Sequence, residues 1–321
     1  MRASVVIPNG NGRHHLETCL AALAVQTERD FEIICVDNES TDDSVAFVES
    51  THPSVRILRL AWNGVFAGAV NAGIRATRGD TIVLLNNDTE AEPRWLEELL
   101  AALDAAPDAS VAASKMLLWD RRDTLHSAGD YYRLDGIPGS RGVWERDDGR
   151  YDADHYIFGA CAGAAAYRRG FFDDIGLFDQ SLVAYCEDVD LNIRALLRGH
   201  RCVFAPAARV YHRLSATGGG AFASYYCARN FVTIAARDLP APIARRHWRS
   251  IVGRQVALAL EAAPKALREP AALARLRGQF DGIRGLPHAL AGRAAMHGRA
   301  KADWRVIESL MRRGPRPVGD A

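Results

Sequence analysis

Short apolar runs alternate, up to about residue 120, with segments whose apolar residues recur every three or four positions. The runs predict buried strands, and the longer period predicts amphipathic helices. Such alternation is typical of an α/β protein with a mostly parallel sheet. The predicted strands are Ser4–Pro8, Phe31–Val36, Val55–Leu60, Thr81–Leu85 and Val111–Leu117, and the predicted helices are approximately His15–Gln26, Asp42–Glu49, Phe66–Ala76 and Arg94–Leu103.

The pattern changes beyond residue 120. Residues 120–156 are rich in turn-forming residues and show no period, and we interpret this stretch as an excursion on the substrate side of the protein, because long loops in compact domains are usually functional or mobile. Regularity returns with a helix at Glu187–Arg198 and a strand at Cys202–His212. We predict a sheet domain over residues 1–220 and a helical region over residues 221–321.

Polar residues follow three of the predicted strands directly. Pro8–Asn9 ends the first strand, Asp37–Asn38 follows the second, and Asn86–Asp88 follows the fourth. In an open α/β sheet the carboxyl ends of the strands form the ligand crevice. A carboxylate there can hold a hard divalent cation that serves substrate phosphates. Asp88 is therefore a candidate cation ligand, although Asn and Asp also open turns and cap helices.

Two common nucleotide-binding motifs are absent. A dinucleotide fingerprint beginning at Gly10 needs a glycine or alanine where the chain has His15, and no phosphate-binding loop of the Gly-x-x-x-x-Gly-Lys-Ser/Thr type occurs. These absences disfavour a dehydrogenase and a P-loop enzyme.

A second carboxylate cluster, Glu187–Asp190, opens a predicted helix. Acidic residues in a first helical turn are also favoured by the helix dipole. Glu187 and Asp190 share one face, whereas Asp188 lies on another, so one carboxylate can act as a general base while the others form hydrogen bonds.

Composition and charge divide the chain. Its 321 residues are 48% hydrophobic and 25% charged, as in an ordinary globular protein, and its six scattered cysteines favour a reducing cytosol. Residues 221–321 carry 18 basic and 7 acidic side chains, whereas the rest of the chain is acidic. This region is predicted to be a helical extension with solvated arginines or a set of amphipathic helices that bind an anionic membrane surface. A nucleic-acid-binding face is the less favoured alternative.

Several motifs in order along the chain resemble the family 2 inverting glycosyltransferases, and in particular their bacterial rhamnosyltransferase-like members. The resemblance covers roughly residues 3–236. The residues that carry it are Val5–Pro8, Val36–Ser44, Asn63–Ile74, Leu85–Thr89, Gly159–Gly163 and Glu187–Leu191.

The resemblance implies a GT-A fold and a magnesium- or manganese-dependent enzyme. It makes Asp188 the general base with Glu187 beside it, Asp88 the cation ligand of an Asp-x-Asp triplet, and His212 a second cation ligand. It implies that the nucleotide sugar is bound by Pro8, Asn9, Asn11, Asp37, Asn38, Asn63, Asn71, Asn87 and Asp88.

Three positions depart from the family pattern. Asn86 replaces the first aspartate of the triplet, which reduces the number of charged ligands. Gly10 stands where relatives carry an aromatic residue, and Val65 where they carry a glycine.

The expected reaction is a single displacement that moves a sugar, with rhamnose a leading candidate, from a dTDP- or UDP-linked donor to a saccharide or lipid-linked acceptor. We expect a cytoplasmic protein that is peripheral to the inner membrane face, with a homo-oligomer left open. The alternative is a non-catalytic nucleotide-sugar-binding or scaffold protein that acts through its basic tail.

Overall fold

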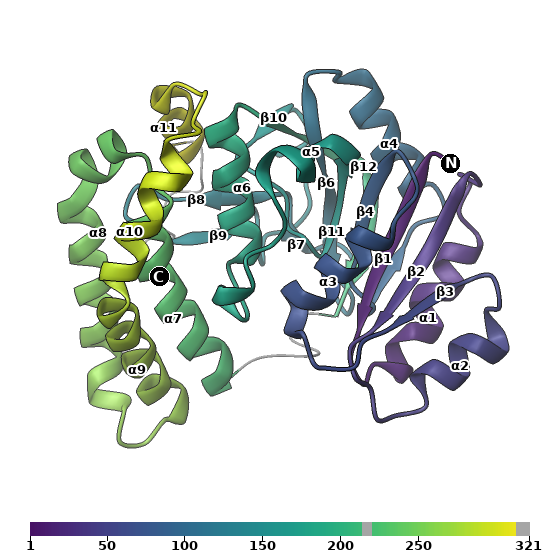
Figure 1. Ribbon diagram of the computed structural model, residues 1–321, viewed down its shortest axis with the longest axis horizontal. Helices are drawn as coiled ribbons and strands as arrows, with labels where there is room; N and C mark the ends of the chain where they lie inside the picture. Colours follow the sequence, from purple (N-terminus) through teal and green to yellow (C-terminus); the bar gives the residue numbers. More distant parts are fainter. Residues whose placement is uncertain (214–219, 313–321) are drawn as a thin grey trace. The chain divides into compact units, whose positions relative to one another are not determined.

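The computed structural model describes residues 1–213 and 220–312 (Figure 1). The chain divides into two compact units whose segments alternate along the sequence. Unit 1 contains residues 1–130, 140–180 and 200–216, and unit 2 contains residues 131–139, 181–199 and 217–321.

Unit 1 is built on a ten-stranded sheet with the order β10-β12-β6-β11-β4-β1-β2-β3, in which β5 pairs with β12 and β7 pairs with β6. The pairs β1–β2, β1–β4, β2–β3 and β6–β12 are parallel, whereas β11 runs antiparallel to both β4 and β6. The strands are β1 (Ala3–Asn9), β2 (Phe31–Asp37), β3 (Arg56–Arg59), β4 (Thr81–Leu85), β5 (Thr89–Ala91), β6 (Ala109–Leu118), β7 (Leu125–Ser127), β10 (Tyr156–Ile157), β11 (Ala164–Arg168) and β12 (Arg201–His212).

Helices cover both faces of this sheet because its central strands are apolar on both sides. Val5 and Ile7 of β1 join the main core cluster with apolar residues of α1 and α4. The intervening Val6 faces α3, where a Cβ on Gly73 would lie 2.3 Å from its Cγ1 atom. The helices of unit 1 are α1 (Arg13–Ala24), α2 (Ser44–Thr51), α3 (Val65–Ala76), α4 (Trp95–Ala105) and α5 (Arg169–Ile175), and the short 3-10 helix η1 (Gln180–Leu182) leads into unit 2.

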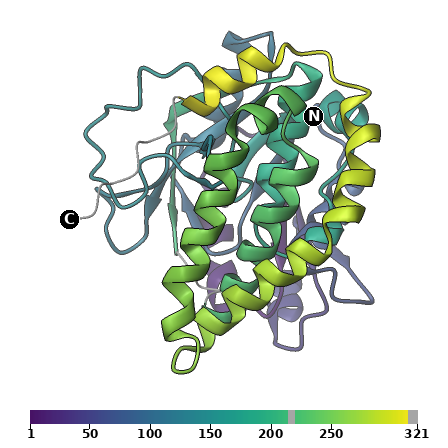
Figure 2. The same cartoon turned by 90° about the vertical axis from the view of Figure 1, so that its left-hand side faces the viewer.

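Unit 2 is mainly helical, and its helices after residue 220 run from green to yellow in Figure 2. Helix α7 packs closely along α9, because two glycines of α9, four residues apart, face α7. A Cβ on Gly278 would lie 2.1 Å from the carbonyl oxygen of Tyr225, and a Cβ on Gly282 would lie 2.9 Å from the carbonyl oxygen of Arg229. The elements are β8 (Asp130–Tyr132), β9 (Pro138–Ser140), α6 (Glu187–Arg198), α7 (Gly220–Arg237), α8 (Ala241–Ala262), η2 (Ala263–Lys265), α9 (Pro270–Arg284), α10 (Leu286–His297) and α11 (Trp304–Arg312).

Among the described residues, no helix combines the length and the apolar character needed to cross a membrane.

The predicted α/β class with a mostly parallel sheet is confirmed. The predictions for Thr81–Leu85 and Glu187–Arg198 match β4 and α6, and other elements differ at their ends by up to about two residues. Residues 120–156 are less irregular than predicted, because they contain β7, β8 and β9. Each of these strands has only three residues, too few to show a period in the sequence.

Candidate functional site

The strand ends of unit 1 meet as the parallel pairing requires. The register of β1 and β2 sets Asn9 opposite Asp37. The buried Asn87 amide donates a hydrogen bond to Asn9 Oδ1 at 2.7 Å, which joins the segment after β4 to the end of β1. A Cβ on Gly12 would lie 2.1 Å from the Asn87 amide nitrogen. A larger residue at Gly12 would therefore displace the side chains of this pair, where the turn after β1 crosses it.

Three predicted donor-binding residues brace the neighbouring loops. Asn11, in the left-handed region with φ +52°, accepts hydrogen bonds from the backbone N–H groups of Thr41 and Asp42 at 2.7 and 3.2 Å. Asn38 Oδ1 accepts a hydrogen bond from the Gly64 N–H, and its amide donates to Asn63 Oδ1. The loops after β1, β2 and β3 are thereby held together at one edge of the sheet.

Val65 shows the consequence of a departure from the family pattern. It lies in the left-handed region with φ +52°, where glycine is favoured and a β-branched residue is strained. Its N–H donates to Asn63 Oδ1 at 2.9 Å, and its carbonyl accepts from the Asn38 amide. These bonds hold Val65 in this left-handed conformation.

The other predicted donor-binding residues differ in their environment. Asp37 is buried, and its Oδ1 atom accepts a hydrogen bond from the Ser40 N–H. Pro8 lies in β1, paired with Val36 of β2. The Asn71 amide group, on α3, forms hydrogen bonds with both the N–H and the carbonyl of Phe178 at 3.0 and 2.9 Å. The roles of these residues in donor binding stay predictions.

Asp88 and His212 form a buried pair at the same edge. The antiparallel register of β5 and β12 sets His212 opposite Thr89, next to Asp88. His212 Nε2 lies 3.2 Å from Asp88 Oδ1, and the side chains are only 9% and 5% exposed. Their contact is not aligned as a hydrogen bond, so Asp88 Oδ1 and both ring nitrogens of His212 are buried without a hydrogen-bond partner.

Two further imidazoles lie close to this pair. His126 of β7 stacks on His212, with ring centroids 4.7 Å apart and planes inclined by 11°. Burial, followed by the proximity of His212, lowers the pKa of His126 to about 3, so the ring is neutral. His15 of α1 is also buried, and this burial lowers its pKa. Nδ1 of His126 and Nε2 of His15 have no hydrogen-bond partner.

His126 was not among the predicted site residues, because its position carries no local signal in the sequence. Only the pairing of β7 with β6, and of β6 with β12, brings it to His212.

The Asp88–His212 pair fits a divalent cation. Buried polar atoms without a partner are rare in native proteins, and a bound cation would satisfy both the carboxylate oxygen and an imidazole nitrogen of this pair. A carboxylate is a suitable ligand for manganese, an imidazole is a common ligand of divalent transition metals, and waters and phosphate oxygens commonly complete such sites.

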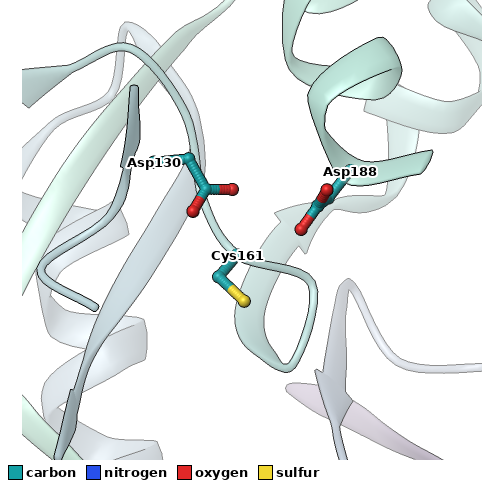
Figure 3. Close-up of side chains that lie close together, drawn as sticks. All are labelled: Asp130, Cys161 and Asp188. Carbon is teal, nitrogen blue, oxygen red and sulfur yellow. The ribbon is translucent and has the colours of Figure 1, made fainter. Parts of the chain in front are cut away.

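Glu187 and Asp188 belong to unit 2, where they form the first turn of α6; Figure 3 shows Asp188 there. An Asp188 carboxylate oxygen accepts a hydrogen bond from the Val189 N–H at 2.8 Å. Burial, and then the neighbouring Asp188 carboxylate, raise the pKa of Glu187 to about 8. Glu187 is therefore protonated at neutral pH, and the two adjacent carboxyl groups need not both be ionised.

The third carboxylate of the cluster has a structural role. Asp190 is fully buried and pairs with Arg194, four residues later, and with Arg237 of α7, both at 2.6 Å. These ion pairs anchor α6 within unit 2.

The segment before Asp188 is strained and tightly held. Val183, Tyr185 and Cys186 all have φ between +64° and +66°, which is unfavourable for residues other than glycine. The buried amide of Asn230, on α7, donates to the carbonyl oxygens of Leu182, Ala184 and Tyr185 at 2.8–3.0 Å. Asn230 therefore fixes the conformation in which the chain enters α6.

A second pair of residues lies in unit 1. Figure 3 also labels Asp130 and Cys161, which place a carboxylate oxygen and a thiol sulfur within 4.8 Å of each other. Cys161 belongs to a segment that carries the family resemblance, but neither residue was predicted to act in the site.

Comparison with known proteins identifies relatives of this chain. A family model described as Glycosyl transferase family 2 matches residues 4–176. The N-acetylglucosaminyl-diphospho-decaprenol L-rhamnosyltransferase of Mycobacterium tuberculosis is 27% identical over 242 residues, which cover 67% of this chain and 77% of that protein. An uncharacterized protein of Sinorhizobium fredii is 27% identical over 234 residues, but this match spans only 25% of its length.

The fold is shared with a solved structure. TarS of S. aureus, residues 1–349 in complex with UDP, superposes with a TM-score of 0.60 at 18% sequence identity, covering 97% of this chain and 89% of that one. At this identity the likeness is one of fold, and it confirms the expected GT-A architecture with a helical carboxyl-terminal region.

Proposed function

The chain belongs to glycosyl transferase family 2, and from this premise we propose that it transfers a sugar from a nucleoside diphosphate to a hydroxyl group with inversion at the anomeric carbon. The observation that carries the proposal is the buried Asp88–His212 pair beside the Asn9–Asn87 hydrogen bond. This edge of the sheet offers cation ligands and amide groups where an open α/β sheet binds its ligand.

The diphosphate would be bound at the strand ends. Asp88 and His212 would hold a magnesium or manganese ion. When bound, this ion would neutralise negative charge on the leaving diphosphate. Asp37 would contact the nucleobase or ribose, and the Asn9–Asn87 pair would keep the strand ends in place.

Asp188 would act as the general base that accepts the proton of the acceptor hydroxyl. The oxygen then attacks the anomeric carbon as the bond to the diphosphate breaks, so a single displacement inverts the configuration. Glu187, protonated at neutral pH, adds no second negative charge beside this base. A positioned base contributes about 10²–10⁴-fold to the rate of such reactions.

The relatives guide the choice of substrates. The mycobacterial relative is named for transfer of L-rhamnose to a lipid-linked acceptor, and the TarS structure contains UDP. We propose a dTDP- or UDP-linked donor, with rhamnose as the leading sugar, and a saccharide or lipid-linked acceptor. The protein would work in the cytoplasm at the inner membrane face.

Replacement of Asp188 by asparagine tests the proposal. Transfer should fall by at least about 10²-fold, while the affinity for the nucleoside diphosphate stays within about twofold, because only the proton acceptor is lost. Transfer rates and nucleotide binding are measured on the same preparations, with manganese present. Near-normal transfer by the variant would refute the assignment of Asp188, and binding without any transfer by the wild-type chain would favour the scaffold alternative.

A further inference from the structure

Helix α8 is apolar on two opposite faces. Ile243, Leu258 and Ala262 are buried within unit 2. On the outer face, large apolar side chains recur every fourth residue and remain more than half exposed: Trp248 (54%), Val252 (52%), Val256 (51%) and Leu260 (68%). Residues four apart lie on neighbouring parts of a helix surface, so these side chains form one stripe, which we call the α8 stripe.

Another large apolar side chain is exposed after the end of the helix. Leu267, in the connection from α8 to α9, is fully exposed. Scattered exposed apolar residues are normal on soluble proteins, but a contiguous apolar row is typical of a binding surface.

Basic residues lie at both ends of the stripe. Arg245 and Arg249 are near its beginning, Lys265 and Arg268 near its end, and all four are exposed. Among the described residues none of these four forms an ion pair, whereas Arg246 pairs with Glu308 and Arg254 with Glu261. Glu269 is the only unpaired acidic residue in the segment from α8 to the start of α9, all of which the structure describes. The surface thus combines an apolar row with uncompensated positive charge.

We propose that the α8 stripe binds an anionic lipid bilayer. The helix would lie in the plane of the interface, with the stripe among the acyl chains and the basic side chains among the headgroups. This inference rests on the proposed function, because a lipid-linked acceptor would be presented at such a surface.

The charge distribution favours lipid over the other occupants. Because both ends of the stripe are basic, pairing with a second copy of the same stripe would bring positive charge against positive charge in either orientation. A nucleic acid would use the arginines but would leave the valine and leucine side chains without a partner.

Vesicle flotation of the full chain tests the proposal, with phosphatidylcholine vesicles that contain or lack phosphatidylglycerol. Wild-type protein should float with the anionic vesicles, and binding should weaken as salt is raised. The double variant Val256→Asp, Leu260→Asp should lose at least about tenfold in partitioning, because charged groups replace inserted apolar ones. The double variant Arg245→Gln, Arg249→Gln should lose roughly fivefold for each arginine on the anionic vesicles.

Val25→Asp is the matched control, since Val25 is an equally exposed valine (57%) in unit 1, and it should float like the wild type. Circular dichroism and nucleotide binding show that each variant is folded. Equal flotation of the stripe variant and the wild type would overturn the proposal. So would a wild-type dimer that ignores vesicles and that the stripe variant converts to monomers. Wild-type chain that floats through its stripe but transfers no sugar would support the membrane surface while refuting the proposed function.

Discussion

Replacing Asn230 by leucine should slow sugar transfer without weakening nucleotide binding. Leucine has nearly the same shape as asparagine but cannot donate hydrogen bonds. The change therefore removes the amide that holds the carbonyl oxygens of Leu182, Ala184 and Tyr185. Asp188 follows this segment directly and depends on it for its position.

The expected magnitude follows from the competing energies. Three non-glycine residues in the left-handed region store roughly 1 kcal/mol each, or about 3 kcal/mol in total. The amide contributes two hydrogens, and losing their bonds to buried acceptors costs about 2–4 kcal/mol. Bond energy and strain are thus of similar size, so without Asn230 the observed conformation should become a minor one. A loss of about 2–4 kcal/mol changes the equilibrium constant by about 30–900-fold. Part of this change reverses the original preference for the observed conformation, so its population, and hence the transfer rate, should fall by about 10–100-fold.

Two measurements locate the effect. Steady-state kinetics should show a fall in kcat, with the affinity for UDP or dTDP unchanged, because the nucleotide is expected to bind to unit 1. Hydrogen exchange should accelerate in residues 182–188. Gln279→Ala is a matched control, because it removes another buried amide of unit 2 that bonds to Gln255 and not to the strained segment. Unchanged kcat in the Asn230 variant, or an equal loss in the Gln279 variant, would refute this reasoning.

Substitutions at two other residues address single groups. Glu187→Gln should be more stable to heat than the wild type, by an amount that grows between pH 5 and 8. In the wild type the folded chain keeps the Glu187 proton up to its pKa of about 8, whereas the unfolded chain releases it above about pH 4.5, so folding of the wild type becomes less favourable as the pH rises. A difference in melting temperature that does not depend on pH would contradict this pKa. His126→Ala should weaken manganese binding about tenfold, whereas His126→Phe should preserve it, because the ring of His212 lacks a hydrogen-bond partner and is oriented by stacking. Titration calorimetry with manganese alone distinguishes these outcomes, and wild-type affinity in the alanine variant would show that stacking is unimportant.

The sequence predicts those features that depend on neighbouring residues. The branched run Thr81–Leu85 has few alternatives to a buried strand, and the acidic first turn of Glu187–Arg198 starts a helix that ends at Gly199. Polar strand ends are informative because parallel pairing brings them to one edge of the sheet.

Features that depend on distant pairing could not be predicted in this way. His126 reaches His212 through the registers of three strands, and one of these, β7, has only three residues. In the sequence, Asn230 is an ordinary polar residue of a helix. Only the fold shows that its amide group contacts the carbonyl oxygens of residues 182–185. The α8 stripe resembles a core-facing pattern in sequence, and only the packing of unit 2 shows that it remains exposed.

The central claim, inverting transfer from a nucleoside diphosphate sugar, is tested most directly by proton NMR of the anomeric centre during turnover. The full chain is incubated with manganese and with dTDP- or UDP-linked sugars, with water as the acceptor. The free sugar that is released with the nucleoside diphosphate is observed before its two anomers equilibrate. The proposed mechanism predicts a product whose anomeric configuration is opposite to that of the donor, and predicts its loss in the Asp188→Asn variant. A product with the donor's configuration, or a chain that binds the nucleotide but turns over none of these donors, would contradict the claim.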